Sequence, residues 1–451
     1  MEKQMLNRSV PPPAAPMKKI PFPTLQHQQL DNGVPVISVP FGTQEIMEVS
    51  LVFPAGRSFE TAPGIATFTG KMMQEGTRQF TGLEFARKLD HYGAYIHVDT
   101  GYETAAFCLT TLSRHMAATV PLLAEVVVAP IFPDKELEKL RNRTLQHLDV
   151  EEKKTAYNAR KEFNRLLFGQ EHPYGRTPEK EDVSAIDVAQ LKAYHARNYN
   201  LRNAFIVVVG RYDEAKLLPI LNAAFGAAAF VSEDAFVDLA GSRALKLTEA
   251  RPSGLHYFEK SDSMQATVRV GHAGFSREHP DYYRLQVVNT ILGGYFGSRL
   301  MKNIREDKGF TYGIGSAWLS MKYSGIFLIQ SDVGNAYIEP TLKEIAHEVN
   351  RLIHEGVGEE ELSLVKNYML GRSASARETP SQIANLIRNT RANGVDISQL
   401  DEKFDIVSSV TTADVKQLAE AYMRPEQMLQ VVCGKMGEEK AEEAASEAVA
   451  E

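Results

Sequence analysis

Residues 289–318 read NTILGGYFGSRLMKNIREDKGFTYGIGSAW, and this stretch decides the fold more than any other part of the chain. Its first part has the apolar spacing of a helix, which we expect to run to about Asp307. Gly309 follows as a helix stop, and after it apolar and polar residues alternate as in a strand. The sequence therefore predicts a helix, a turn and a strand, with Arg305 at the helix exit and Tyr312 at the strand entry.

The chain also contains a long-period repeat. Matching residues recur in its two halves: Val183, Ala189 and Gly210 are repeated as Val407, Ala413 and Gly434. A spacing of about 224 residues with only two copies indicates a duplicated domain and not a solenoid. In both copies a short helix precedes an apolar strand that stops at glycine.

Each half has its strands early and its helices late. In the first half, Asn32-Gly33 predicts a hairpin turn. A helix is expected over residues 61–75, a capping box begins at Thr81, and residues 94–111 alternate as two strands. This order predicts an α+β fold of two homologous domains, each a mostly antiparallel sheet packed with helices.

Changes in composition mark the domain boundaries. We expect an N-terminal arm that lies on the surface, a linker between the halves, and a disordered Glu/Ala-rich tail. The predicted parts are a Pro-rich arm at 1–23, a first domain at 24–226, a linker at 227–254, a second domain at 255–436 and a tail at 437–451.

Composition also restricts the class of protein. The chain has 451 residues, 43% of them apolar, and a net charge of −7, which argues against a nucleic-acid partner. It shows no signal peptide and no membrane-spanning apolar stretch, so we expect a cytoplasmic protein without a membrane partner. Cys108 and Cys433 lie in apolar runs and are expected to be buried thiols. One basic stripe, expected to be a solvated helix face, consists of Arg299, Lys302, Arg305 and Lys308.

Several motifs together carry a resemblance to a known family. They are Phe53-Pro54-Ala55-Gly56-Arg57, Gly64-Ile65-Ala66, Glu75-Gly76-Thr77, His172-Pro173-Tyr174-Gly175 and the 289–318 stretch. With the duplicated domains, they make about residues 25–435 resemble the insulinase/pitrilysin-type zinc peptidases, the inverzincins that include mitochondrial processing peptidase. The resemblance implies a clam-shell arrangement of the two domains.

Active members of that family carry a His-x-x-Glu-His motif that binds zinc and activates a water molecule. The matching positions here are Thr67, Gly70 and Lys71. Threonine is a poor zinc ligand, glycine supplies no general base, and an ammonium group at position 71 would repel the metal by roughly 4 kcal/mol at an effective dielectric of about 20. Glu151 or Glu152 matches the expected third ligand, but one carboxylate does not make a site. We therefore expect this chain to bind no catalytic zinc and no other cofactor.

The helix that carries these positions also has a plain interpretation as a core helix with a polar face. We expect it to end at Gly76. Its buried stripe is predicted to consist of Ile65, Phe68 and Met72.

Arg305 and Tyr312 are both present at the family's spacing. From spacing alone, Arg305 offsets the negative end of its helix, and Tyr312 packs in the core beside Phe310 and Ile314. The resemblance instead implies that the two side chains bind peptide substrate and stabilise an oxyanion across a chamber from the zinc. Gly293-Gly294 either lets the backbone approach that peptide or serves helix packing.

A chain with the Arg/Tyr pair but without the metal motif resembles the non-catalytic subunit of a two-chain peptidase. The resemblance implies a heterodimer in which a homologous, HxxEH-bearing partner supplies zinc and this chain closes the chamber around a peptide. It would be inactive alone. Two alternatives remain open: a structural or peptide-binding protein, like the core subunits of a respiratory complex, and a divergent hydrolase with other ligands, for which His91 and His97 are the nearest histidine pair.

Overall fold

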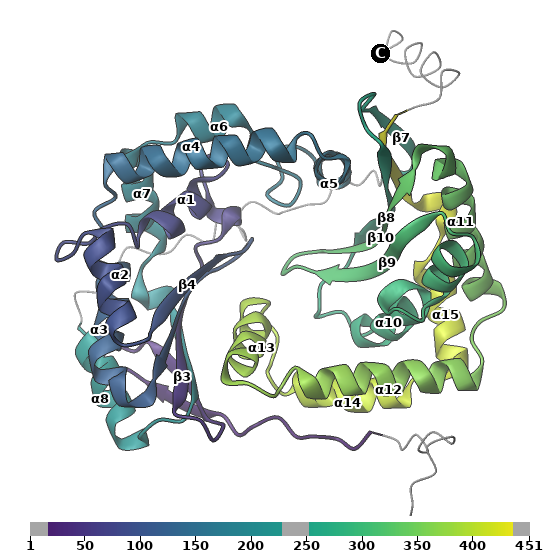
Figure 1. Cartoon of the computed structure of the whole chain (residues 1–451). Helices are drawn as coiled ribbons and strands as arrows, with labels where there is room; N and C mark the ends of the chain where they lie inside the picture. The colour runs from purple at the N-terminus through teal and green to yellow at the C-terminus, as the bar shows by residue number, and fades with distance from the viewer. Residues whose placement is uncertain (1–16, 228–251, 436–451) are drawn as a thin grey trace, which may run out of the picture.

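The computed structural model describes residues 17–227 and 252–435. The predicted tail beyond Lys435, most of the predicted linker and the first part of the Pro-rich arm therefore lie outside the described residues. The chain folds into two halves that face each other (Figure 1). Each half is built on its own sheet.

The first half holds a six-stranded sheet with helices around it. Its elements are β1 (Gln26–Gln29), β2 (Pro35–Pro40), β3 (Ile46–Phe53), α1 (Ile65–Met72), α2 (Gly82–His91), β4 (Tyr95–Thr100), β5 (Ala105–Leu112), α3 (Met116–Val128), α4 (Asp134–Glu151), α5 (Thr155–Phe168), α6 (Lys180–Ala185), α7 (Val188–Asn198), β6 (Phe205–Gly210) and α8 (Glu214–Phe225). The strand order is β1-β2-β6-β3-β5-β4. The β2–β6 pair is parallel and the other four pairs are antiparallel.

The second half repeats this plan with five strands. Its elements are β7 (Gly254–Glu259), β8 (Gln265–Gly274), α10 (Tyr282–Asn289), η5 (Thr290–Gly294), η6 (Met301–Asp307), β9 (Thr311–Ser320), β10 (Gly325–Gly334), α11 (Ile338–His354), α12 (Glu359–Ser375), α13 (Pro380–Ala392), α14 (Gln399–Ser409), α15 (Thr412–Tyr422) and β11 (Leu429–Gly434). The order β7-β11-β8-β10-β9, with β7 and β11 parallel, matches that of the first sheet from β2 to β4. The predicted α+β fold of two duplicated domains is confirmed.

The two halves exchange a helix. Helix α5 of the first half packs on β8 and β11 of the second sheet, and α13 of the second half packs on β3 and β6 of the first. Phe163 on α5 joins a buried cluster with Leu429, and Ile383 on α13 joins one with Val207. The two helices occupy equivalent places in the repeat, so the exchange is reciprocal. It fixes each half to the other through buried apolar contacts.

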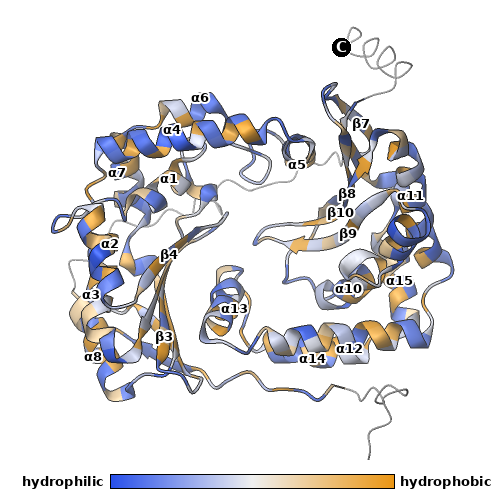
Figure 2. Ribbon diagram, in the orientation of Figure 1, coloured by the Kyte–Doolittle hydropathy of each residue, from blue (hydrophilic) through white to orange (hydrophobic). Residues whose placement is uncertain are grey.

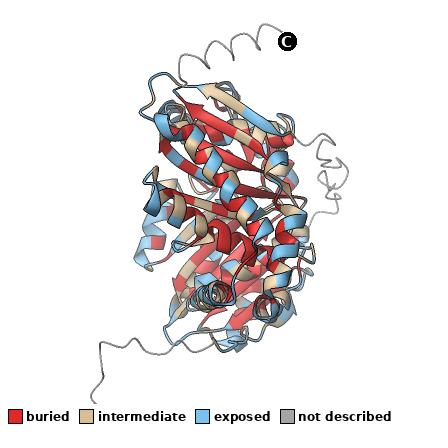
Figure 3. Cartoon of the chain, turned by 90° about the vertical axis from the view of Figure 1, so that its right-hand side faces the viewer, coloured by how far each residue is buried: buried red, intermediate tan, exposed pale blue. Residues whose placement is uncertain are grey.

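A buried ion pair reinforces the second of these contacts. The guanidinium of Arg388 on α13 donates hydrogen bonds to the Glu48 carboxylate and the Ser50 hydroxyl on β3. Glu48 is only 4% exposed. Figure 3, which views the molecule from the side of the second half, shows buried residues along its strands and exposed residues on its outer helices.

Local turn chemistry agrees with the sequence in most places. Gly33 adopts a φ of +85° in the predicted hairpin, and Thr81 forms the predicted capping box with Glu84. The helix expected over residues 61–75 is shorter, however, and spans only Ile65–Met72. Gly64 precedes it with a φ of +94°, which an α-helix cannot include. Gly76 does not end the helix, because it forms a β-bridge with Thr81 further along the chain.

The core follows the hydropathy of the elements. Figure 2 shows hydrophobic residues on the strands and on the helix faces that contact them, whereas the outward face of α11 is hydrophilic. Cys108 in β5 and Cys433 in β11 are both buried, as predicted.

The described part of the N-terminal arm lies along α14, where Lys19 pairs with Asp405 and the Phe22 amide donates to Asp401. Within the described ranges, no helix combines the length and apolar character needed to cross a membrane.

Candidate functional site

Helix α1 carries the three positions that match the zinc motif. Gly64 starts the helix, and its buried side is formed by the three residues predicted for it: Ile65, Phe68 and Met72. Thr67 is half-buried, Gly70 is buried and Lys71 is exposed. The helix contacts α7 and strand β4 most closely among its neighbours of regular structure.

Gly70 allows this close approach to β4. A Cβ atom added at position 70 would lie 3.0 Å from Thr100 Oγ1 and 3.2 Å from Val98 Cγ1. Both distances are shorter than a comfortable van der Waals contact. A larger side chain at position 70 would have to displace strand β4. The family carries its general base at this position, and here the side chains of β4 occupy the space that such a side chain would need.

Lys71 lies beside a second cation, Arg143 on α4. Although Lys71 is exposed as a residue, partial burial of its ammonium group and then the charge of Arg143 lower its pKa. Two cationic groups at this position repel a dication. Neither candidate for the third ligand faces them as a free carboxylate, because Glu151 pairs with Lys154 and Glu152 with Lys180.

These residues do not fit a zinc ion. Zinc sites are built from Cys, His and carboxylate ligands, and Thr67 and Lys71 provide none of them. Across residues 17–227 and 252–435, no three His, Cys, Asp or Glu side chains come together in a way that would hold a metal. His91 and His97 also belong to no such group. The residues at positions 67, 70 and 71 therefore do not form the metal site that the HxxEH motif would provide.

The helix–turn–strand unit of the second half brings Arg305 and Tyr312 together. Met301–Asp307 is π-helical, Gly309 turns the chain with a φ of +67°, and β9 begins at Thr311, as the sequence predicts apart from the helix type. The Nε atom of Arg305 donates a hydrogen bond of 3.0 Å to the backbone carbonyl of Tyr312. The guanidinium therefore bridges the end of the helix and the start of the strand.

An aromatic side chain completes this arrangement. The Arg305 guanidinium lies 4.6 Å from the centre of the Phe296 ring, a distance typical of a cation–π contact. Phe296 is 64% exposed and Tyr312 is 93% exposed. Tyr312 is therefore not packed in the core beside Phe310 and Ile314, which was the plain alternative for it. Arg305, Tyr312, Phe310 and Tyr337 line an open hollow of about 680 Å³.

The segment before the pair has unusual backbone structure. Thr290–Gly294 and Met301–Asp307 are both π-helical, a conformation that is rare and often found at functional sites. Phe296 lies in the turn between them. Gly293 serves packing here, because a Cβ at that position would lie 2.6 Å from the Ser316 backbone nitrogen.

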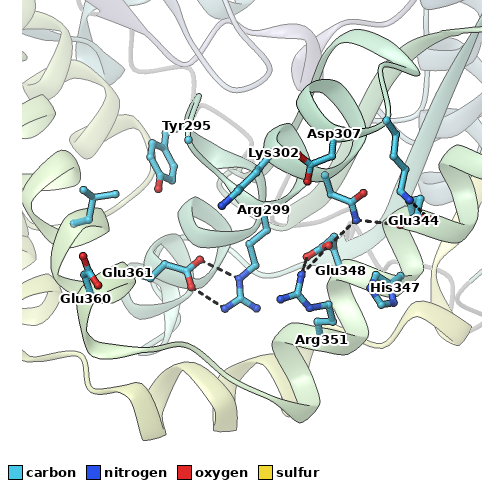
Figure 4. Close-up of a pocket in the computed structure, with 14 residues that line it drawn as sticks. Tyr295, Arg299, Lys302, Asp307, Glu344, His347, Glu348, Arg351, Glu360 and Glu361 are labelled. Carbon is cyan, nitrogen blue, oxygen red and sulfur yellow. Dashed lines mark hydrogen bonds and ion pairs between the residues drawn. The ribbon is translucent and has the colours of Figure 1, made fainter.

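The basic stripe is not a uniformly solvated face. Arg299 is largely buried and makes two hydrogen bonds to the Glu361 carboxylate, which Figure 4 shows at the centre of a charged pocket. In the same pocket Glu348 accepts from Asn303 and Arg351. Lys308 pairs with Glu344. Acidic partners from α11 and α12 thus neutralise Arg299 and Lys308. Arg305 lines the hollow beside Tyr312, with the Glu306 carboxylate 3.9 Å from one Nη atom.

Sequence reasoning found Arg305 and Tyr312 but missed their surroundings. Phe296 carried a weak signal, since an aromatic residue follows Tyr295 in an otherwise small-residue turn. Arg143 and Val98 carried no signal in the sequence, because their contacts with α1 depend on how α4 and β4 pack against that helix. No hydrogen bond or ion pair links Thr67 or Lys71 to Arg305 or Tyr312 in the described structure, so the two sets remain separate sites.

Comparison with known proteins gives a consistent result. Residues 36–172 match the family described as insulinase (peptidase family M16), and residues 185–369 match the peptidase M16 inactive domain. A Rickettsia bellii protein called an uncharacterized zinc protease is 23% identical over 87% of this chain and 93% of its own length. The Helicobacter pylori protein called non-peptidase homolog YmxG is 24% identical over 88% of this chain and 91% of its own length.

A solved structure gives the same fold. The crystal structure of a peptidase M16 inactive domain from Pseudomonas fluorescens superposes with a TM-score of 0.83 at 26% identity. The match covers 92% of this chain and 98% of that chain.

Proposed function

The chain belongs to the insulinase family of peptidases, M16, and we propose that it is the non-catalytic subunit of a two-chain zinc metallopeptidase. In this role it closes the peptide chamber and presents Arg305 and Tyr312 to a substrate bound at the zinc of a homologous subunit. That subunit carries the HxxEH motif, and this chain supplies neither metal nor general base.

One observation carries the proposal. The Arg305–Tyr312 unit is fully formed and solvent-facing, whereas α1 has glycine packed against β4 at the place of the general base and a lysine at the place of a ligand. A guanidinium and a phenol are both hydrogen-bond donors, and donors aimed at a developing oxyanion supply a large part of catalysis in acyl transfer. This chain offers the substrate-binding residues of a peptidase site but not its metal ligands or general base, so a second chain must supply them.

The test is reconstitution with an HxxEH-bearing homologue from the same cell. Each chain is purified alone and then mixed, and mass is measured by light scattering while peptide hydrolysis is measured in parallel. We expect a 1:1 complex that hydrolyses peptide, with one zinc per pair and no activity from this chain alone. Failure of this chain to associate with any such homologue would overturn the subunit role.

A second candidate is a structural or peptide-binding protein without peptidase work. The name of the Helicobacter pylori relative, non-peptidase homolog, favours it. The two candidates separate in the reconstitution experiment, because a purely structural protein would leave the hydrolysis rate of a zinc-bearing homologue unchanged.

A further inference from the structure

A second polar cavity lies at the junction of four helices in the second half. It has a volume of about 380 Å³ and is lined by residues of α10, α12, α13 and α14. Pockets for small ligands have volumes of about 300–1,000 Å³. We call it the basic cavity. Its defining residues are Arg277, Trp318, Tyr283, Arg372, Arg377 and Lys403.

The charges around the basic cavity are not balanced. Arg377 pairs with Asp401 at 3.2 Å, but Arg277, Arg372 and Lys403 form no ion pair within the described ranges. The Nε atom of Arg277 is buried and has no hydrogen-bond partner there. The described lining also includes no aspartate or glutamate. Within the described structure, three cationic side chains without an ion pair therefore line one partly open cavity, with Arg277 and Lys403 half-buried and Arg372 at the exposed rim.

Burial and the neighbouring cations both disfavour the charged form of Lys403. Burial and then the charges of Arg277, Arg377 and Arg372 lower the pKa of Lys403 to about 8. A buried cation is normally paired or neutralised, because removing it from water is costly. An anion in the cavity would satisfy all three groups at once.

We propose that the basic cavity binds a small phosphate compound with several negative charges. Arg277 and Arg372 offer guanidinium forks whose geometry matches phosphate oxygens, and Lys403 adds a point charge. Three cationic groups exceed the charge of a single peptide carboxylate and match that of a diphosphate. Trp318 and Tyr283 provide apolar walls for the remainder of the ligand.

One chain forms the whole cavity, so the site does not depend on a peptidase partner. Its residues are also distinct from Arg305, Tyr312 and the positions on α1. If the reconstitution experiment rejects the peptidase role, the phosphate site still stands. If phosphate binding is not observed, the peptidase role is unaffected.

The chain contains a built-in reporter for this site. Trp318 is the single tryptophan of the sequence and lines the basic cavity. Titration of the full-length chain with pyrophosphate, followed by tryptophan fluorescence and confirmed by calorimetry, should give a saturable change at one site per chain. Tripolyphosphate should act in the same way, and binding should weaken with salt.

Three variants make the test specific. Arg372→Gln at the cavity rim and Lys403→Met on α14 should each weaken pyrophosphate binding by about 10-fold or more, because each removes a charge-assisted contact. Lys343→Met is the matched control, since Lys343 is an exposed lysine of α11 outside the cavity. It should bind as the unaltered chain does. Circular dichroism checks that each variant is folded, and Arg372 is exposed enough for its replacement to be tolerated.

Three results would overturn the proposal. The first is no saturable response at millimolar pyrophosphate. The second is equal binding by the Arg372→Gln, Lys403→Met and Lys343→Met variants, which would place the anion elsewhere. The third is tighter binding of citrate, whose similar charge is carried on carboxylates, which would exclude phosphate as the preferred chemistry.

Discussion

The Nε atom of Arg305 donates a hydrogen bond of 3.0 Å to the carbonyl oxygen of Tyr312. This bond uses one donor of the guanidinium, and one of its Nη atoms lies 3.9 Å from the Glu306 carboxylate. Arg305 is held from a second side by Phe296. The Arg305 guanidinium is therefore held in place before any peptide or partner binds, which is the condition for preorganised stabilisation of an oxyanion by this donor.

Removal of the Tyr312 hydroxyl tests this role directly. In the reconstituted pair, Tyr312→Phe should lower the rate of peptide hydrolysis by about 10²–10³, the usual cost of losing one oxyanion donor. Assembly should be unchanged, because the phenyl ring is kept. Hydrolysis is followed with a quenched fluorescent peptide, and complex formation by light scattering.

A neighbouring tyrosine supplies the control. Tyr337 lines the same hollow and stacks on Phe310, so Tyr337→Phe removes a hydroxyl nearby without touching the proposed donors. Its complex should hydrolyse peptide at the unaltered rate. Full activity in a well-formed Tyr312→Phe complex would show that the Tyr312 hydroxyl does not reach the substrate.

The isolated chain should bind zinc no better after its motif is partly restored. Thr67→His with Lys71→His returns two ligands to α1 and removes the lysine charge. We expect no stoichiometric zinc at neutral pH, because Arg143 still faces the site and Glu151 and Glu152 are held by lysines. Elemental analysis after dialysis decides the matter. One zinc per chain in this variant would mean that the two lysine pairs open easily.

Gly70 and Gly371 make a matched pair for testing the packing of α1. Alanine in place of a helical glycine normally stabilises by about 0.5–1 kcal/mol. Gly371→Ala on α12 should show this gain, because an added Cβ meets nothing within 4 Å. Gly70→Ala should show a smaller gain or a loss, because its Cβ would press on Thr100 and Val98. Urea unfolding of the two variants gives the comparison, and equal gains would show that β4 yields without cost.

Local signals in the sequence predicted several turns and caps and the helix–turn–strand unit of Arg305 and Tyr312. Asn32-Gly33, Thr81 and Gly309 each act on the few residues beside them, and the structure follows all three. The error at 61–75 has a local cause as well, since the left-handed Gly64 begins the helix later than its apolar spacing suggests. The π-helical form of Met301–Asp307 was not predictable, because its apolar spacing does not distinguish it from an α-helix.

Contacts between distant segments were beyond reach of such signals. Arg299 pairs with Glu361 and Arg388 with Glu48, and neither pair is marked in the sequence. The basic cavity likewise joins side chains from helices that are far apart along the chain. A single sequence states the type of each residue but not which helix will face which, and those pairings decide whether a cation is solvated, paired or left in a cavity.

The ion pair between the halves should be important for stability. Arg388→Met leaves the buried Glu48 carboxylate without its cationic partner and, among the described residues, with only the Ser50 hydroxyl as a donor, which should lower the free energy of unfolding by about 3–5 kcal/mol. Combining it with Glu48→Leu should recover most of the loss, because the buried charge is then absent. Lys216→Met, which removes an exposed pair with Asp213, should change stability by no more than about 1 kcal/mol. Denaturant unfolding measures all three, and a small effect of Arg388→Met alone would mean that water reaches Glu48.

Lys403 gives a pH dependence of known sign. Its pKa is lowered from 10.5 to about 8 in the folded chain, so between pH 8 and about 10.5 the unfolded chain binds a proton at this residue that the folded chain has released. The contribution of Lys403 to the free energy of unfolding therefore rises with pH across that window. Below pH 8 the lysine is charged in both states, and its buried charge destabilises the folded chain. Lys403→Met should be more stable than the unaltered chain at pH 7, and the difference should shrink by pH 10. Because other groups titrate in both proteins, the difference between their urea midpoints isolates Lys403.

The groups facing Lys403 from the surrounding elements are Arg277, Tyr282, Tyr283, Tyr368, Arg372 and Arg377. Bound pyrophosphate should favour the charged form of Lys403. The affinity of the chain for pyrophosphate should therefore fall as the pH rises through about 8 and the lysine loses its proton. A difference between the two proteins that stays constant from pH 7 to pH 10 would show that Lys403 keeps its proton throughout.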